Sequence, residues 1–357
     1  MDRNATPYSN LKIFHHHDVL NKVEKGERCD PLYIRIKPTN ICNHNCYYCH
    51  YKNAYLTLNE YDVNDYIPYD KMMEIVHDME KMGVKAVTFS GGGEPLAYPY
   101  IEETMERVLK AGIDLSIITN GSMLTGKKAH ILAKAKWVRI SIDSIISENY
   151  ARIRGISENA LEILLRNIEE FAKIKDKKCE LGINFVVGKE NYSEITDVAV
   201  TMKKLGANHV KFAPLFSNET EEYHKDIKDE VISTLSGLAD ELNSDQFRII
   251  DLYTSDFDND YKVFKRTYSR CPIKEFVCVI GANSKVYFCH DKAYLKDGCV
   301  CDLTKQSFMH GWNSEEVTKK FKEFDAQKIC GQHCVYDSRN ILINSYLDMD
   351  KEHVNFI

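Results

Sequence analysis

The sequence predicts an α/β protein, a partial (β/α)6 barrel of the TIM type with a small cysteine-rich C-terminal appendage. Six short apolar runs alternate with amphipathic segments, which is the pattern of parallel strands joined by crossover helices. Polar and glycine-rich stretches follow these runs, where such sheets place their chemistry. Seven of the twelve cysteines lie in the last 87 residues, where helical periodicity is weak, and this predicts the appendage.

The elements are predicted in chain order. Residues 1–31 form a short helical lead-in, and the barrel occupies residues 32–245. Its expected strands are 32–36, 86–89, 115–119, 137–142, 181–187 and 210–213. Ile101, Met105 and Val108 mark one amphipathic helix, which Gly112 ends, and the segment 225–242 is expected to form another. Residues 246–357 are expected to hold a linker and the appendage.

Three cysteines follow the first predicted strand at the spacing C-x3-C-x2-C, namely Cys42, Cys46 and Cys49. Closely spaced thiolates are typical of iron–sulfur clusters, and three ligands leave the fourth iron open. A zinc site with His44 as fourth ligand is one alternative. Disulfides are the other, although they suit small secreted domains better than a chain of 357 residues.

The cysteine stretch resembles the signature of the radical S-adenosylmethionine (radical SAM) family, C-x3-C-x-aromatic-C, with Tyr48 as the aromatic residue. The resemblance implies that Cys42, Cys46 and Cys49 hold a [4Fe–4S] cluster whose open iron binds S-adenosylmethionine. It further implies reductive cleavage of that cofactor to a 5′-deoxyadenosyl radical, which abstracts hydrogen from the substrate. A flavodoxin- or ferredoxin-type electron donor is then expected as a partner.

Further cofactor-binding residues are expected at the ends of later strands. A glycine-rich turn after a strand lets a ligand approach the main chain. The run Gly91-Gly92-Gly93-Glu94-Pro95 resembles the GGEP motif of the family, which holds the methionine ammonium. Family placement also implies roles for Asn120, Ser141, Asp143 and Arg154 at the ribose and the methionine carboxylate. From the residues alone, these are also compatible with strand-end caps and a solvated arginine.

The appendage contains a second set of cysteines, Cys271, Cys289, Cys330 and Cys334. Four thiolates can complete an auxiliary [4Fe–4S] cluster without an open iron, and from spacing alone a zinc site is nearly as plausible. The segment resembles the twitch domain, the one-cluster form of the SPASM domain behind radical SAM barrels. Two details depart from that pattern: Ser284 stands where glycine is usual, and the last pair is C-x3-C.

Cys278, Cys299 and Cys301 remain unassigned by this pattern. Free cysteines are most often buried small hydrophobic residues. Cys278 lies between two expected ligands, so it is the preferred hydrogen donor if the reaction is an epimerisation.

The expected function is oxidation of a small-molecule substrate, sugar-like or cyclitol-like, by a radical SAM oxidoreductase whose auxiliary cluster accepts an electron. Radical modification of a ribosomal peptide is the alternative, although residues 1–31 show no separate peptide-recognition domain. An iron–sulfur electron carrier or redox sensor is the non-enzyme alternative, but it would have no use for the Gly91–Glu94 turn.

Composition excludes several classes of partner. The formal charge is −6 and the pI about 6.1, so no nucleic-acid partner is expected. Neither a signal peptide nor an apolar stretch of membrane-spanning length is present, which predicts a cytoplasmic protein without a membrane partner.

Overall fold

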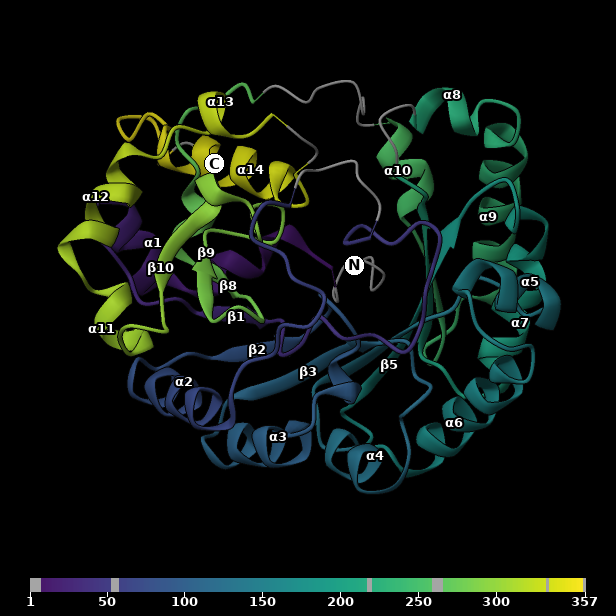
Figure 1. The fold of residues 1–357 in the computed structure, drawn as a ribbon. Coiled ribbons are helices and arrows are strands. Elements are labelled where there is room, and N and C mark those ends of the chain that lie inside the picture. Colours follow the sequence, from purple (N-terminus) through teal and green to yellow (C-terminus); the bar gives the residue numbers. More distant parts are fainter. Residues whose placement is uncertain (1–7, 53–57, 217–219, 259–265, 332–333, 356–357) are drawn as a thin grey trace.

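The structure is a computed structural model, and it describes residues 8–52, 58–216, 220–258, 266–331 and 334–355. Its centre is a ten-stranded sheet in the order β10-β9-β8-β1-β2-β3-β4-β5-β6-β7. The sheet bends into an open arc with helices on its convex side (Figure 1). The predicted fold class, an incomplete α/β barrel with a cysteine-rich C-terminal region, is confirmed.

Seven parallel strands form the barrel part of the sheet. They are β1 (Tyr33–Ile36), β2 (Ala86–Phe89), β3 (Asp114–Thr119), β4 (Trp137–Ser141), β5 (Glu180–Val187), β6 (His209–Pro214) and β7 (Arg248–Asp251). The first six match the predicted strands to within one residue at each end. The seventh lies beyond the predicted barrel end at residue 245, so the sheet continues into the segment expected to be a linker, whose residues 259–265 lie outside the described residues.

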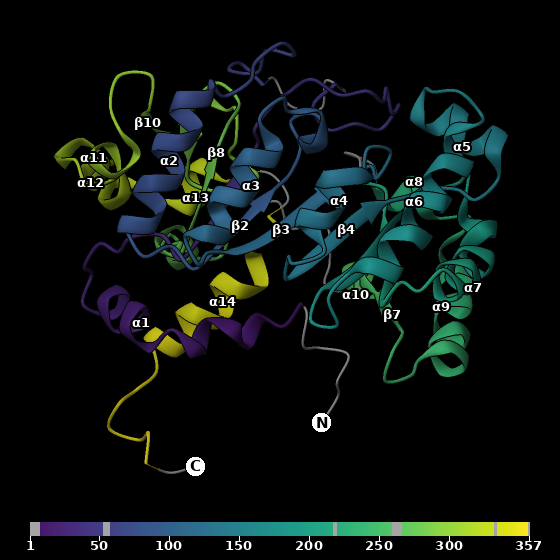
Figure 2. The ribbon, with the colours of Figure 1, turned by 90° about the horizontal axis from the view of Figure 1, so that it is seen from below.

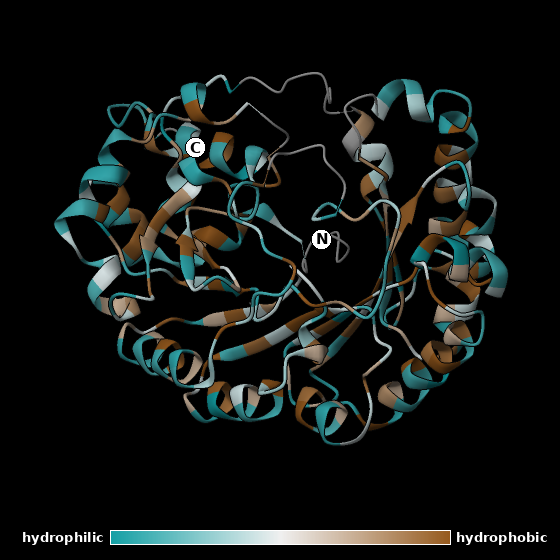
Figure 3. Ribbon diagram, in the orientation of Figure 1, coloured by the Kyte–Doolittle hydropathy of each residue, from teal (hydrophilic) through white to brown (hydrophobic). Residues whose placement is uncertain are grey.

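Helices cover the convex face between successive strands, as Figure 2 shows from below. They are α2 (Tyr69–Lys81), α3 (Ile101–Lys110), α4 (Gly126–Leu132), α5 (Ser147–Arg154), α6 (Ala160–Ile174), α7 (Ile195–Lys204), α8 (Thr220–His224), α9 (Lys228–Leu242) and α10 (Leu252–Asp258). Their hydrophobic and hydrophilic residues alternate along each helix (Figure 3), as expected of amphipathic helices with one face on a sheet. The predicted helix 225–242 begins three residues later than expected.

The appendage is built onto the same sheet rather than beside it. Strand β8 (Val277–Ile280) pairs in parallel with β1, and the antiparallel strands β9 (Lys285–Tyr287) and β10 (Cys299–Asp302) follow. Helices α1 (His17–Glu24), α11 (Phe308–Trp312), α12 (Glu315–Glu323), α13 (Ala326–Ile329) and α14 (Asp337–Leu347) lie on this side of the molecule (Figure 1). The edge of the barrel sheet at β1 is therefore paired with a strand of the appendage.

The two faces of the barrel sheet differ in chemistry. Ile34 and Ile36 of β1, like Val138 and Ile140 of β4, are fully buried in the core shared with the outer helices. Because successive side chains of a strand point to opposite faces, Arg35 and Arg139 lie on the concave inner face. The outer face therefore carries the hydrophobic core and the inner face carries polar chemistry.

No helix in the described part of the chain is both long and apolar enough to cross a membrane.

Candidate functional site

The cysteine loop begins directly after β1, at the carboxyl end of the sheet. Cys42, Cys46 and Cys49 are all partly buried and form no disulfide. Burial raises the pKa of Cys42 to about 11 and also raises the pKa of Cys46. These thiols are thus held in one short loop, close enough for Cys46 to interact electrostatically with both of the others.

The glycine run packs against the segment that leads into this loop. The Gly93 amide donates to the Thr39 carbonyl at 2.8 Å, and the Glu94 amide donates to the Ile41 carbonyl at 2.9 Å. A Cβ atom at Gly93 would lie 2.1 Å from the Ile41 carbonyl oxygen, and one at Gly92 would lie 1.8 Å from the side chain of Asn40. Glycine is therefore required here because two main chains touch.

Glu94 is a buried carboxylate that joins the ends of two strands. Its oxygens accept hydrogen bonds from the Leu96 amide at 3.0 Å, the Thr119 hydroxyl at 2.5 Å and the Asn120 amide at 2.8 Å. Glu94 is 3% exposed. Burial raises the pKa of its carboxyl group, although the three hydrogen bonds act in the opposite direction. The carboxylate thus holds the ends of β2 and β3 together, and its Oε2 atom, with one donor, can still accept from a ligand's ammonium group.

Asp143 and Arg154 form a buried ion pair beside the cysteine loop. An Arg154 guanidinium nitrogen lies 2.5 Å from the Asp143 carboxylate, and their side chains are 5% and 0% exposed. The same carboxylate accepts the Tyr48 hydroxyl at 2.5 Å, while Arg154 also donates to Cys46 Sγ at 3.7 Å. Two predicted cofactor ligands, the aromatic residue of the loop and one cysteine are thus brought into a single cluster of contacts.

Asn120 connects the end of β3 to the cysteine loop, since its amide donates to the Asn43 side chain at 2.8 Å. Ser141 ends β4 and is partly exposed on the inner face.

On the far side of the cysteine loop, the Asn45 amide donates to the Arg154 carbonyl at 2.8 Å. A Cβ at Gly155, which ends α5 with a φ of 61°, would meet the Asn45 carbonyl oxygen at 2.7 Å. The loop is therefore fixed by the ends of three neighbouring strands and one helix.

The second cysteine set gathers at one place in the appendage. Cys271 precedes a short 3-10 helix, Cys289 follows β9, and Cys330 and Cys334 lie between α13 and α14. All four are partly buried, and Cys271 interacts electrostatically with each of the other three. Burial raises the pKa of all four thiols, to about 11 for Cys271 and about 12 for Cys334.

Among the described residues, no three His, Cys, Asp or Glu side chains are grouped around a single metal position. A zinc ion needs all its ligands within about 2.3 Å of one point. In a cubane the thiolates bind separate irons, so they surround the cluster without converging.

Cys278 is placed away from the predicted site. It lies on β8 opposite Ile34 of β1, is 1% exposed, and belongs to the core on the outer face of the sheet. Burial raises its pKa well above the ordinary value of a thiol. This placement does not favour the predicted donor role, because the thiol points toward the outer helices rather than the inner face.

Basic residues between the two cysteine sets did not enter the sequence interpretation. Lys37 is fully buried, donates to the Gly91 carbonyl at 2.8 Å and to the Tyr51 hydroxyl, and stands 4.5 Å from the centre of the Tyr51 ring. Burial lowers its pKa well below the ordinary value of lysine. The signal was present in the strand itself, where Arg35 and Lys37 alternate with isoleucines.

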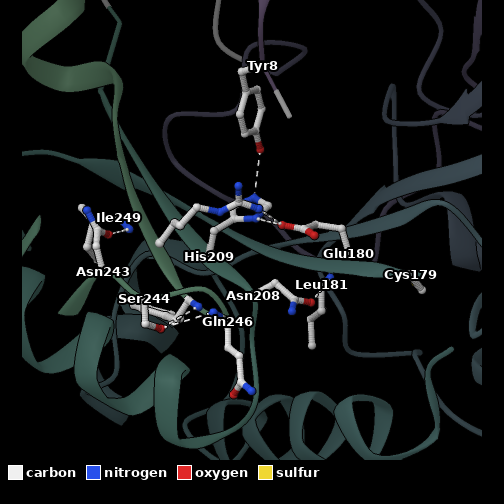
Figure 4. A network of polar contacts seen from close by, with 12 residues as sticks. Tyr8, Cys179, Glu180, Leu181, Asn208, His209, Asn243, Ser244, Gln246 and Ile249 are labelled. Atoms are coloured by element: carbon white, nitrogen blue, oxygen red, sulfur yellow. Dashed lines mark hydrogen bonds and ion pairs between the residues drawn. The ribbon is translucent and has the colours of Figure 1, made fainter. Parts of the chain in front are cut away.

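A separate polar network closes the amino-terminal end of the inner face (Figure 4). The His209 ring lies 3.1 Å from the Tyr8 hydroxyl on one side and 3.1 Å from the Glu180 carboxylate on the other. Arg248 also pairs with Glu180, at 2.9 Å. Gly182 leaves the space for this ring, since a Cβ there would lie 2.3 Å from His209 Nε2.

Comparison with known proteins gives a family match for part of the chain and a shared fold. Residues 36–202 match the family described as the radical SAM superfamily. A probable GTP 3′,8-cyclase of Thermococcus kodakarensis is 33% identical over 177 residues, 48% of this chain and 53% of that protein. The GTP 3′,8-cyclase of Helicobacter pylori is 26% identical over 322 residues, 81% of this chain and 95% of that protein. The chain spans about half the length, or less, of the first curated relatives it matches.

Two solved structures share the fold at low sequence identity. Streptococcus suis SuiB bound to S-adenosylmethionine superimposes with a TM-score of 0.63 at 16% identity, over 89% of this chain and 72% of that one. The enzyme anSMEcpe with bound AdoMet gives a TM-score of 0.60 at 19% identity, over 87% and 88%. Both matches extend well beyond residues 36–202, so they include most of the appendage.

Proposed function

The chain carries a radical SAM domain, and from this premise we propose that the protein is a radical SAM oxidoreductase that acts on a small-molecule substrate. The predicted family resemblance, the enzyme class and the class of cofactor, a [4Fe–4S] cluster with S-adenosylmethionine, are confirmed by the family match and the relatives. The residues that hold these groups and the identity of the substrate remain proposals.

One observation carries the proposal: the cysteine loop is bound on three sides by the segments expected to hold S-adenosylmethionine. Gly93, Asn120 and Arg154 each contact this loop or the residues that lead into it. An electron carrier needs no such arrangement of glycine main chain, buried carboxylates and arginine around its cysteines. The arrangement therefore supports an enzyme that binds a second ligand beside the cluster.

The proposed division of work among the residues follows from their contacts. Cys42, Cys46 and Cys49 would hold the cluster, which when bound supplies the electron that cleaves the cofactor's sulfonium bond to a 5′-deoxyadenosyl radical. The main chain of Gly91, Gly92 and Gly93 would accept the methionine ammonium together with Glu94. Arg154 would orient the methionine carboxylate, with Asp143 and Tyr48 fixing the guanidinium, while Ser141 and Asn120 are proposed at the ribose.

The auxiliary site supports an oxidative outcome. Cys271, Cys289, Cys330 and Cys334 lie close together in an appendage that is hydrogen-bonded to the first barrel strand. Four thiolates suit a fully ligated cluster that exchanges electrons and does not bind substrate. We propose that this site accepts the electron of the substrate radical, and that a flavodoxin- or ferredoxin-type protein supplies the first electron.

The comparisons do not support a sugar or cyclitol as the substrate. The relatives are named for GTP cyclisation, and another, from Lacinutrix mariniflava, is an S-adenosylmethionine-dependent nucleotide dehydratase. These names keep small molecules first and favour nucleotides over sugars. Peptide modification is the second candidate, because one SuiB structure is bound to the precursor peptide SuiA, but that likeness, at 18% identity, extends to the fold alone.

The proposed function is tested by reductive cleavage without any substrate. The anaerobically reconstituted protein, reduced with dithionite, is expected to convert S-adenosylmethionine to 5′-deoxyadenosine, measured by liquid chromatography. Simultaneous replacement of Cys42, Cys46 and Cys49 by Ala should abolish this product. Cys179→Ala is the matched control, because Cys179 is buried at the start of β5 away from both cysteine sets. Cleavage that survives in the triple variant would refute the assignment.

A further inference from the structure

The inner face of the barrel sheet is basic. Five Lys or Arg side chains point inward: Arg35, Arg139, Lys211 and Arg248 on four strands, and Lys37 directly after β1. Within β1–β7, the inner face carries one partly buried carboxylate, Glu180 at the start of β5. It already interacts with His209 and Arg248. Asp114 at the start of β3 is exposed and pairs with Lys136. Arg248 therefore has a carboxylate partner, and Asp291 of the appendage interacts electrostatically with Arg35 and Lys37.

Arg35 and Arg139 have unused hydrogen-bonding capacity. The Nε atom of each is buried and has no hydrogen-bond partner among the described residues. Neither guanidinium forms an ion pair with a carboxylate among the described residues. The Arg139 guanidinium lies 5.9 Å from the centre of the Trp137 ring. Both side chains remain partly exposed, so a ligand can reach them. Buried polar atoms without a partner are rare in proteins and call for an explanation.

Both guanidinium groups act on the same part of the inner face. The Tyr33 hydroxyl donates to Thr88 at 2.8 Å, and Thr88 is hydrogen-bonded to Ser116 at 2.7 Å, which joins three strands beneath them. Burial opposes ionisation of Tyr33, yet the charge of Arg35, hydrogen bonds with Thr88 and Arg35, and the charge of Arg139 together lower the pKa of that phenol. Both arginines therefore act on the same tyrosine.

The imidazole of His290 reaches the same region from the appendage. Its Nδ1 atom is buried and, like the Nε atoms of the two arginines, has no hydrogen-bond partner among the described residues. Lys37 interacts electrostatically with Cys49 of the first cysteine set, and His290 directly follows Cys289 of the second. The region therefore adjoins both sets, where a substrate must sit if it is to give up hydrogen on one side and an electron on the other.

We propose that Arg35 and Arg139 bind an oxyanion of the substrate, a phosphate or a carboxylate, on the inner face between the two cysteine sets. This inference rests on the proposed function and specifies its substrate class. A guanidinium matches either oxyanion with two parallel hydrogen bonds, and such charge-assisted bonds are stronger than neutral ones. The oxyanion would supply the acceptors that both Nε atoms lack.

The test uses isothermal titration calorimetry on the anaerobically reconstituted protein with S-adenosylmethionine. One arm titrates pyrophosphate and the other titrates citrate, both at ionic strength matched with NaCl. Probe concentrations reach about 10 mM, enough to saturate a site with a Kd of about 1 mM. Arg35→Gln and Arg139→Gln remove the two guanidinium groups. Arg107→Gln is the matched control, because Arg107 pairs with Glu80 on the outer surface.

At least one probe is expected to bind the native protein at a single site, and each inner-face variant should weaken it by about tenfold or more. Arg107→Gln should bind like the native protein. Binding of pyrophosphate alone assigns a phosphate, binding of citrate alone assigns a carboxylate, and binding of both assigns a general oxyanion site. Arg35→Lys and Arg139→Lys keep the charge without the paired geometry, so an intermediate affinity is expected.

The proposal is overturned if neither probe saturates the native protein, or if both glutamine variants bind as well as the control. Circular dichroism and iron content establish that each variant is folded, and the lysine variants replace any glutamine variant that is not. Release of 5′-deoxyadenosine by the native protein is measured in the same preparation. Its absence would refute the proposed function, whereas its presence without anion binding would refute the oxyanion site alone.

Discussion

Replacing Asp143 by Asn should destabilise the protein strongly, because it leaves a buried positive charge without its partner. Asp143 is fully buried and pairs with Arg154 at 2.5 Å, and it also accepts the Tyr48 hydroxyl at 2.5 Å and the Val186 amide at 3.3 Å. Asparagine has nearly the same shape, so the substitution removes charge and one acceptor without leaving a cavity.

The expected magnitude follows from the burial of the pair. Removing one partner of a buried ion pair costs about 3–5 kcal/mol of the free energy of unfolding, most of it the penalty of the remaining buried charge. Replacing both partners avoids that penalty. Arg154→Met combined with Asp143→Asn should therefore be less destabilised than the sum of the two single variants, by about 1–3 kcal/mol.

The assay is urea denaturation of the metal-free protein under reducing conditions, followed by circular dichroism. Glu80→Gln is the control, since Glu80 pairs with Arg107 on the surface and exposed ion pairs contribute little. If Asp143→Asn shifts the midpoint no more than Glu80→Gln, or if the double variant equals the sum of the single variants, the buried pair does not stabilise the site as argued.

Three further predictions concern single residues away from this pair. Ser284 has a φ of 56°, in the left-handed region that favours glycine; Ser284→Gly should therefore raise the free energy of unfolding by about 1 kcal/mol, and Ser284→Ala should not, as measured by denaturation. Cys278→Ala should lower stability by about 1–2 kcal/mol through loss of buried volume and leave product formation intact once a substrate is known; stalled turnover with continued 5′-deoxyadenosine release would instead establish the donor role. Burial lowers the pKa of His209, so on acidification the unfolded chain binds a proton before the folded chain does, and stability should fall as pH drops below about 6.5. Thermal unfolding should show a weaker fall with pH in His209→Gln. An unchanged dependence of stability on pH in that variant would contradict this reasoning.

Local sequence predicted the elements that depend on local pattern. Runs of β-branched residues located six strands, and apolar spacing located helices such as α3 and α6. The predicted barrel end at residue 245 left β7 outside, because the acidic stretch after it indicates a linker. That β7 belongs to the barrel sheet follows from its pairing with β6, a contact between strands that the local pattern does not specify.

The attachment of the appendage depended on contacts distant in sequence. Strand β8 pairs with β1 although about 240 residues separate them, and this register turns Cys278 toward the outer core. The sequence showed Cys278 between two expected ligands but not which face its side chain would occupy. The inner-face arginines were missed for a related reason: Arg35 and Arg139 look like solvated residues until the sheet curves around them.

Metal analysis combined with Mössbauer spectroscopy tests most directly the central claim that two cysteine sets hold two clusters. The anaerobically reconstituted native protein is expected to hold about eight irons in two cubanes. The triple alanine variant of Cys42, Cys46 and Cys49 should keep about four, all in one fully thiolate-ligated cluster held by the second set. Stoichiometric zinc in place of iron in the triple variant would contradict the account, since the appendage would then have no electron-accepting role.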